Sequence, residues 1–353
     1  KFYKNERIIF IMKKTKFLLV LIFLGLIISC GKKDSNKENL QKSVISSKGK
    51  KSKKEIQEKN SYIKKYKQYV TLSNKIHDVN KQITSYFQDA GENEKLSRNE
   101  IPGSGFSLFT PDILPNLKNT IAKTPKIEGL DEKAQRLLTA LEKMKPLTDQ
   151  IQYYYFNDKK YLDDNYKQGK EIHKQISAVY PEYKKSLEDF DTEMGNIQKA
   201  SVQEYLQEFE KKGYFIQYNA VLIMSLGEEI LTEYSRQKLY AGNVIEADIS
   251  KIKPLYEKLE KALSDFKKFS TDKNQIEKEG FAFKASGGDI FRFTNMSDNF
   301  TGTVRILIKR VNEKNRIRDY DGRLNYDQTV GTPENANYIF KILINSYNQL
   351  MKR

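Results

Sequence analysis

Three side chains near the middle of the sequence could carry out acid–base chemistry. Asp163 and Asp164 are adjacent, and His173 follows them about two to three helical turns later. A turn between two helices would bring the carboxylates and the imidazole together, and general acid–base catalysis uses such groups. The other interpretation is a polar cap where two helices join. We expect the cap, and the sequence therefore predicts a protein that is not an enzyme. A hydrolase of cell-wall or lipid material that uses these three residues is the alternative.

Signatures of metal and cofactor sites are missing from the sequence. The other histidine, His77, falls in a different helical segment from His173, and no HExxH or cysteine–histidine spacing occurs. Neither glycine-rich phosphate motif nor a GxSxG nucleophile motif is present. A run that starts at Asp319 hints at calcium, but the twelfth position of an EF-hand loop would be Val330 instead of Glu. We predict no cofactor and no metal. A solute- or metal-capturing protein with a carboxylate-lined cavity is a further alternative.

The only cysteine, Cys30, ends a segment that looks like an export signal. Lysines follow Met12, an apolar run covers residues 17–28, and the small residue Ser29 comes directly before the cysteine. This order resembles the lipobox of bacterial lipoproteins, in which the cysteine is acylated, for example with palmitate, and becomes the first mature residue. The apolar run of about 12 residues is short of the roughly 20 that a transmembrane anchor needs. We therefore predict lipidation of Cys30, with membrane lipid as a partner.

These signals divide the chain into four parts. Residues 1–11 precede Met12 and look like an upstream, non-native extension, and residues 12–29 form the predicted signal peptide. Residues 30–55 comprise the lipidated Cys30 and a Lys/Ser-rich tether, which has too few apolar side chains to fold. Residues 56–353 form the predicted folded domain.

Most of the net charge of +16 lies outside the predicted domain. Residues 1–30 hold six Lys or Arg and one Glu, and residues 31–60 hold ten Lys and four acidic residues, which leaves +5 for the rest of the chain. A nucleic-acid binder carries its basic charge on its folded domain. The sequence therefore predicts no nucleic-acid partner.

Apolar residues recur at helical spacing along most of the predicted domain. The periodic segments are 56–90, 131–156, 169–213, 213–240, 248–269, 293–311 and 332–350. We predict an all-α fold, an elongated bundle of about six or seven helices, with one long Pro/Gly-containing loop over 91–129 and a short helix near 111–122. Asp131 is the expected N-cap of the second segment, and Thr332 followed by Pro333 is the expected start of the last. Pro146 and Pro181 should kink or split their helices.

The stretch from Tyr153 to His173 also carries a family resemblance. Its Tyr-Tyr, Lys-x-Tyr-x-Asp-Asp and Gly-Lys-Glu-x-His elements, together with the closing Tyr-Asn segment over 344–350, resemble the YiiG-like family of bacterial lipoproteins. The resemblance covers about residues 55–353. It implies a fold and a location, but the family is a domain of unknown function and supplies no catalytic residue. The three consecutive tyrosines over 153–155 could stack on sugars, and the alternative is that one or two of them belong to the core.

Together these observations predict a lipid-anchored protein of the cell envelope with a non-enzymatic binding or scaffolding role. Its partner would be an envelope protein or the cell wall. Gly31 follows Cys30, where an Asp would indicate retention in the inner membrane. We therefore expect the periplasmic face of the outer membrane if the cell has two membranes, and the cell surface if it has one.

Overall fold

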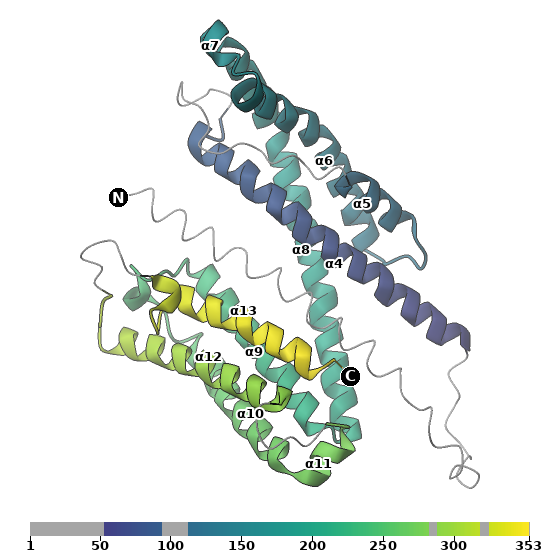
Figure 1. Ribbon diagram of the computed structural model, residues 1–353, viewed down its shortest axis with the longest axis vertical. Helices are drawn as coiled ribbons and strands as arrows, with labels where there is room; N and C mark the ends of the chain where they lie inside the picture. Colours follow the sequence, from purple (N-terminus) through teal and green to yellow (C-terminus); the bar gives the residue numbers. More distant parts are fainter. Residues whose placement is uncertain (1–52, 94–111, 282–287, 318–324, 353) are drawn as a thin grey trace. The chain divides into compact units, whose positions relative to one another are not determined.

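The computed structural model describes residues 53–93, 112–281, 288–317 and 325–352 (Figure 1). Within these ranges the chain forms ten α-helices, eight of them with seven or more residues, and no strand. The helices are α4 (Lys53–Ala90), α5 (Ile113–Ala122), α6 (Leu130–Ile151), α7 (Tyr161–Asp164), α8 (Lys167–Lys212), α9 (Phe215–Arg236), α10 (Lys253–Thr271), α11 (Lys273–Lys278), α12 (Asp289–Asn312) and α13 (Pro333–Leu350). A π-helical turn, Gln152–Asn157, follows α6, and 3-10 turns cover Val244–Glu246 and Tyr326–Gln328.

The all-α prediction is confirmed, but the predicted number of helices is too low. All seven periodic segments form helices, and α5, α7 and α11 are additional. Helices α7 and α11 have four and six residues, which is too short for an apolar period to show in the sequence. Helix α5 lies within the segment predicted as a long loop, where a short helix was expected. Residues 94–111 of that segment, like the predicted signal and most of the tether, lie outside the described residues.

Neither internal proline ends its helix. Pro146 lies inside the 22-residue α6, and Pro181 lies inside the 46-residue α8. A proline removes one backbone hydrogen bond, and a long helix with a packed face retains enough other interactions to continue through it. The sequence could not distinguish a kink from a break, because that outcome depends on how much of the helix is buried.

The described residues divide into two compact units, which we call the N-terminal unit (those up to Ile197) and the C-terminal unit (those from Gln198 onward). In the N-terminal unit, α5 packs against both α4 and α6. Helix α4 also contacts α6 through Lys65 and α8 through Tyr66. In the C-terminal unit, α9 packs against α10, and α12 packs against α13. Among the described residues, no helix combines the length and the apolar character that crossing a membrane requires.

Aromatic rings fill the core of the C-terminal unit. Phe300 and Phe340 lie with ring centroids 5.0 Å apart, and both rings lie close to Gly227 of α9. A side chain at Gly227 would collide with the Phe340 ring, so this glycine is needed for the close approach of α9. Thr332 caps α13 by accepting from the Asn335 amide at 2.9 Å, as its sequence predicted.

A buried lysine joins three segments of the N-terminal unit. The side chain of Lys65 in α4 is fully buried, and its ammonium donates to the backbone carbonyls of Ile121 (3.2 Å) and Lys123 (2.6 Å) and to Asp131 (2.6 Å). Asp131 also accepts from the Tyr69 hydroxyl at 2.7 Å. Asp131 was the expected N-cap of α6, but Gly129 occupies that position, and Asp131 lies in the first turn. Its carboxylate instead connects α6 to α4.

We predict that Lys65→Met destabilises the protein much more than Lys64→Met. Loss of Lys65 leaves the Asp131 carboxylate, and two carbonyls, without their cation, and breaking such a buried pair costs about 3–5 kcal/mol. Lys64 is exposed on the same helix, so its replacement tests the effect of charge alone. Urea unfolding followed by far-UV circular dichroism measures both variants. Equal unfolding midpoints for the two would contradict the role given to Lys65.

Candidate functional site

The buried imidazole of His173 has a hydrogen-bond partner at each ring nitrogen. Its Nδ1 lies 2.8 Å from the Tyr86 hydroxyl of α4, and its Nε2 lies 2.6 Å from the Asn93 carbonyl oxygen. A carbonyl only accepts, so Nε2 carries the hydrogen and Nδ1 accepts from Tyr86. Burial lowers the pKa of His173 below its usual value of 6.5, which favours the neutral ring. The side chain therefore fastens the end of α4 to α8.

The two aspartates have different partners from the histidine. Asp164 accepts from the Tyr154 hydroxyl at 2.6 Å and from the Gln168 amide at 2.8 Å. The Tyr154 hydrogen bond, followed by the bonds from backbone amides, lowers the pKa of Asp164. Asp163 is exposed on α7. Among the hydrogen bonds of the described residues, none connects either aspartate with His173.

The segment from Gln152 to Gly169, which we call the tyrosine turn, has an unusual backbone. It begins with the π-helical turn Gln152–Asn157, a conformation that is rare and often found at functional sites. Lys159, Asn165 and Tyr166 then adopt left-handed conformations, with φ of 52°, 50° and 65°. Such conformations strain residues other than glycine and persist only when surrounding contacts impose them.

Stacked tyrosine rings impose this conformation. The Tyr155 and Tyr161 rings are nearly parallel with centroids 6.0 Å apart, and Tyr161 continues to Tyr166 at 5.5 Å. Tyr154 packs edge-on against Tyr155 at 4.7 Å. The column thus connects the π-helical turn, α7 and the residue that precedes α8.

Gly169 allows the first turn of α8 to approach these rings. A side chain there would collide with the Tyr155 hydroxyl and would lie 2.8 Å from Cε1 of Tyr154. The Tyr155 hydroxyl is buried without a hydrogen-bond partner, and burial raises its pKa to about 12. Close packing therefore holds the rings of Tyr154 and Tyr155 in place.

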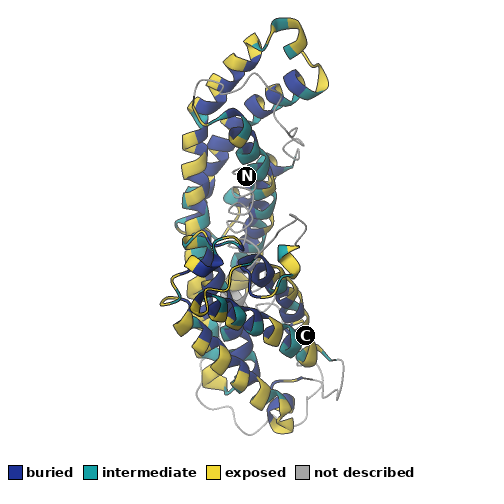
Figure 2. Cartoon of the chain, turned by 90° about the vertical axis from the view of Figure 1, so that its left-hand side faces the viewer, coloured by how far each residue is buried: buried dark blue, intermediate teal, exposed yellow. Residues whose placement is uncertain are grey.

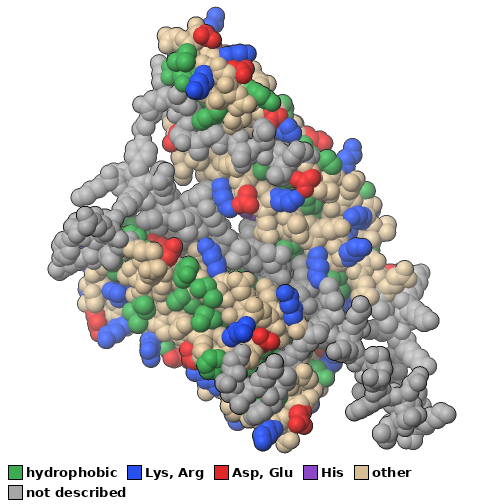
Figure 3. All heavy atoms as spheres, viewed as in Figure 1, with side chains coloured by type: hydrophobic (Ala, Val, Ile, Leu, Met, Phe, Trp, Pro, Cys, Tyr) green, Lys and Arg blue, Asp and Glu red, His purple; other side chains and the backbone are tan. Residues whose placement is uncertain are grey.

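The tyrosine turn also exposes apolar side chains to solvent. Tyr153 is 52% exposed and Leu162 is 71% exposed, whereas Tyr154 and Tyr155 are buried. Two of the three consecutive tyrosines thus belong to the core, and the third points outward. Most residues of the tyrosine turn from Asn157 to Asn165 are exposed, as the end of the unit that carries α7 shows in Figure 2. Hydrophobic side chains and charges of both signs are visible at this end of the N-terminal unit (Figure 3).

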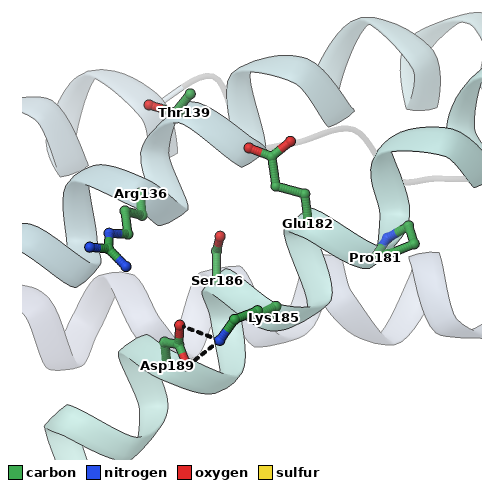
Figure 4. Close-up of a pocket in the computed structure, with 7 residues that line it drawn as sticks. All are labelled: Arg136, Thr139, Pro181, Glu182, Lys185, Ser186 and Asp189. Atoms are coloured by element: carbon green, nitrogen blue, oxygen red, sulfur yellow. Dashed lines mark hydrogen bonds and ion pairs between the residues drawn. The ribbon is translucent and has the colours of Figure 1, made fainter.

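A groove between α6 and α8 is a second candidate site (Figure 4). It has a volume of about 520 Å³ and is lined by Arg136, Thr139, Pro181, Glu182, Lys185, Ser186 and Asp189. Its charged groups already have partners: Lys185 lies 3.0 Å from Asp189, and Glu182 lies 2.7 Å from Lys143 outside the groove. None of Asp163, Asp164 and His173 lines this groove. We consider the tyrosine turn the stronger candidate because it combines strain, packed rings and exposed apolar groups.

Other parts of the predicted chemistry can be placed only in part. Cys30 and the start of the calcium-like run, Asp319, lie outside the described residues. Asn325, further along that run, caps a 3-10 turn by accepting from the Asp327 amide. Among the described residues, no group of three or more His, Cys, Asp or Glu side chains is placed to hold a metal ion.

Sequence reasoning found the tyrosine turn but not its structure. The repeated tyrosines and the Asp-Asp pair drew attention to the stretch. The π-helical turn and the left-handed Asn165 and Tyr166 have no periodic signal, and only the preference of asparagine for left-handed conformations could have suggested one of them. The exposure of Leu162 depends on where α7 packs, which the sequence alone does not specify.

The fold and the site define the class of protein: an all-α protein of two helical units with a tyrosine-rich turn that presents apolar side chains. Residues 60–349 match the family described as "Protein of unknown function (DUF3829)", and the chain belongs to this family. No curated protein and no solved structure gives a significant match to the chain. The match covers most of the range over which the YiiG-like resemblance was noted, and the lipoprotein features of that resemblance stay predictions.

We predict that His173 makes the protein less stable in mild acid. Because its pKa is lower in the folded state than in the unfolded chain, the unfolded chain binds a proton more readily. The stability that the neutral His173 contributes is fully present above the pKa of the unfolded chain. As the pH falls below that value, the free energy of unfolding decreases by at most about 1.4 kcal/mol per pH unit. Urea unfolding at about pH 7.5 and about pH 5.5 should show a smaller pH-dependent loss for His173→Gln than for the unchanged protein. A His77→Gln variant serves as the comparison, and an equal reduction in it would argue against this assignment.

We predict that Gly169→Ala destabilises the tyrosine turn, whereas Gly195→Ala in the same helix does not. The new methyl group at residue 169 would overpack the rings, at a cost of about 1–3 kcal/mol. Gly195 has nothing within 4 Å of the added methyl, so alanine should be neutral or stabilising there. Tyr155→Phe removes the nearest clashing atom and should partly rescue Gly169→Ala. Unfolding midpoints and the near-UV circular dichroism of tyrosine measure these effects, and a lack of rescue would show that the Tyr155 hydroxyl is not the obstacle.

Proposed function

We propose that this protein is a lipid-anchored, non-enzymatic binding protein of the cell envelope, and that the tyrosine turn is its contact site. The observation that carries the proposal is the exposure of Tyr153 and Leu162 on a backbone that packed rings hold in a strained conformation. Strain of this kind is retained where function requires a fixed geometry. A backbone that is already held in one conformation loses little entropy on binding, which favours affinity.

The predicted lipidation of Cys30 supports the location. The basic start, the short apolar run and the small residue before Cys30 follow the order of a lipoprotein signal. One acyl chain gives only marginal membrane binding, and two or more give stable anchoring. The lysines between Cys30 and α4 would add attraction to an anionic membrane surface, of about 1 kcal/mol each near the surface.

The hydrogen bonds of His173 favour a binding role over the alternative of a hydrolase. A general base needs a free nitrogen that faces the substrate, but both ring nitrogens of His173 already have hydrogen-bond partners, the Tyr86 hydroxyl and the Asn93 carbonyl oxygen. Asp164 is likewise held by Tyr154 and by the start of α8. These contacts are those of a junction between helices.

We predict that Cys30→Ala abolishes incorporation of a clickable palmitate analogue into the protein in growing cells. The thiol of Cys30 is the only sulfhydryl in the chain, so no other cysteine can take the label. Fluorescence of the labelled band and partition into Triton X-114 measure the modification. Cys30→Ser is a second variant that should behave the same way. Undiminished labelling of both variants would rule out the lipobox assignment and, with it, the proposed anchoring.

A further inference from the structure

The tyrosine turn lies at the end of the N-terminal unit opposite to the start of α4. Lys65, near the beginning of α4, contacts Asp131 at the beginning of α6, and Tyr86, near the end of α4, contacts His173 at the beginning of α8. Helices α4 and α6 therefore run in the same direction, and the turn follows the end of α6, as Figure 1 shows. At 1.5 Å per residue, the 38 residues of α4 span about 57 Å.

The tether would enter this unit at the start of α4. The turn would thus lie at the other end of this unit from the point where the anchored segment enters it, about the length of α4 away. A chain anchored as proposed would share its compartment with the cell wall.

The charge of the tyrosine turn does not select an anionic partner. Between Gln152 and Gly169 the chain carries three lysines and three aspartates, which balance. One aspartate, Asp164, is held by Tyr154, and another, Asp158, lies 3.5 Å from Lys160. Anionic lipid headgroups and nucleic acids both need an excess of positive charge.

The exposed groups of the turn suit an uncharged polyol. Tyr153 offers a large apolar ring with a hydroxyl at its end, and such side chains contact surfaces that are apolar on one side and wet on the other. Asn165 is exposed, and its amide can donate and accept hydrogen bonds. Asn157 is also exposed; its amide oxygen accepts from Gln152 at 2.9 Å, and its amide nitrogen can donate. A sugar ring has the matching pattern, because its C–H face is apolar and its rim carries hydroxyl groups.

We infer that the tyrosine turn binds the glycan backbone of the cell wall, with the exposed ring of Tyr153 lying against the C–H face of a sugar. The inference rests on the proposed function, because it depends on an envelope location and on this turn as the contact site. Leu162 would flank the bound sugar and shield it from water. Binding involves no covalent step.

The test uses the full chain purified in detergent, which excludes a membrane as the partner. Two probes are chitotetraose, an uncharged oligomer of N-acetylglucosamine, measured by calorimetry, and isolated cell-wall sacculi, measured by co-sedimentation. The unchanged protein should bind both. Tyr153→Ala should weaken binding about tenfold, and Tyr153→Phe, which keeps the ring, should stay within about twofold.

A matched control is Tyr338→Ala, because Tyr338 is 44% exposed on α13 in the other unit. It should leave binding unchanged. Far-UV circular dichroism should show each of these variants folded, since both tyrosines are exposed. Failure of the unchanged protein to bind either probe, or binding that Tyr153→Ala leaves intact, would overturn the glycan assignment.

A separate experiment tests whether the tyrosine turn binds a membrane instead of a glycan. Co-sedimentation with phosphatidylethanolamine–phosphatidylglycerol vesicles is measured for the chain carrying Cys30→Ala, with and without Leu162→Ala. Vesicle binding that depends on Leu162, without glycan binding, would replace the glycan with a lipid surface. Absence of palmitate labelling in the unchanged protein, or undiminished labelling of the Cys30 variants, is a different result, because it would refute the proposed anchoring. A negative glycan result with labelling that depends on Cys30 would refute only the assignment of the partner.

Discussion

The N-terminal unit depends on a single buried ammonium group. Lys65 lies within the packed face of α4, where an uncompensated charge would be very costly, and it is stable there because three oxygen atoms surround it. Those oxygens come from the end of α5, the connection after it and the first turn of α6. The requirement to satisfy one cation therefore fixes where the connection between α5 and α6 runs, and it sets the register between α4 and α6.

Lys65 and Asp131 join α4 and α6 near their beginnings. Near the ends of these two helices, hydrogen bonds and ring packing hold the structure together. His173 links α8 to α4 through Tyr86, and Tyr154 links the π-helical turn to Asp164. The polar groups that the sequence singled out as catalytic candidates thus join α4 to α8 and the π-helical turn to α7. The strain in the turn persists because stacked rings and Gly169 leave the backbone no better packed alternative.

In the C-terminal unit, a buried carboxylate joins two helices. The carboxylate of Glu279, just after α11, accepts from the Ile216 and Gln217 amides at the start of α9, at 2.7 Å and 2.9 Å. Burial raises the pKa of Glu279, but the two amides are donors that the start of a helix would otherwise leave unpaired. A side chain about 60 residues away in the chain therefore caps the most apolar helix of this unit.

The sequence by itself determined the class of fold and the extent of its main helices, because the apolar residues of an amphipathic helix recur with a period of 3.6 residues. It also determined the start of α13 at Thr332 and Pro333, since capping is a local interaction. Only the tertiary structure decided that Asp131 pairs with Lys65, and that Asp164 and His173 face different partners. Those pairings depend on which groups the packing of helices brings together and removes from water. Two residues far apart in the sequence carry no local signal that they will meet.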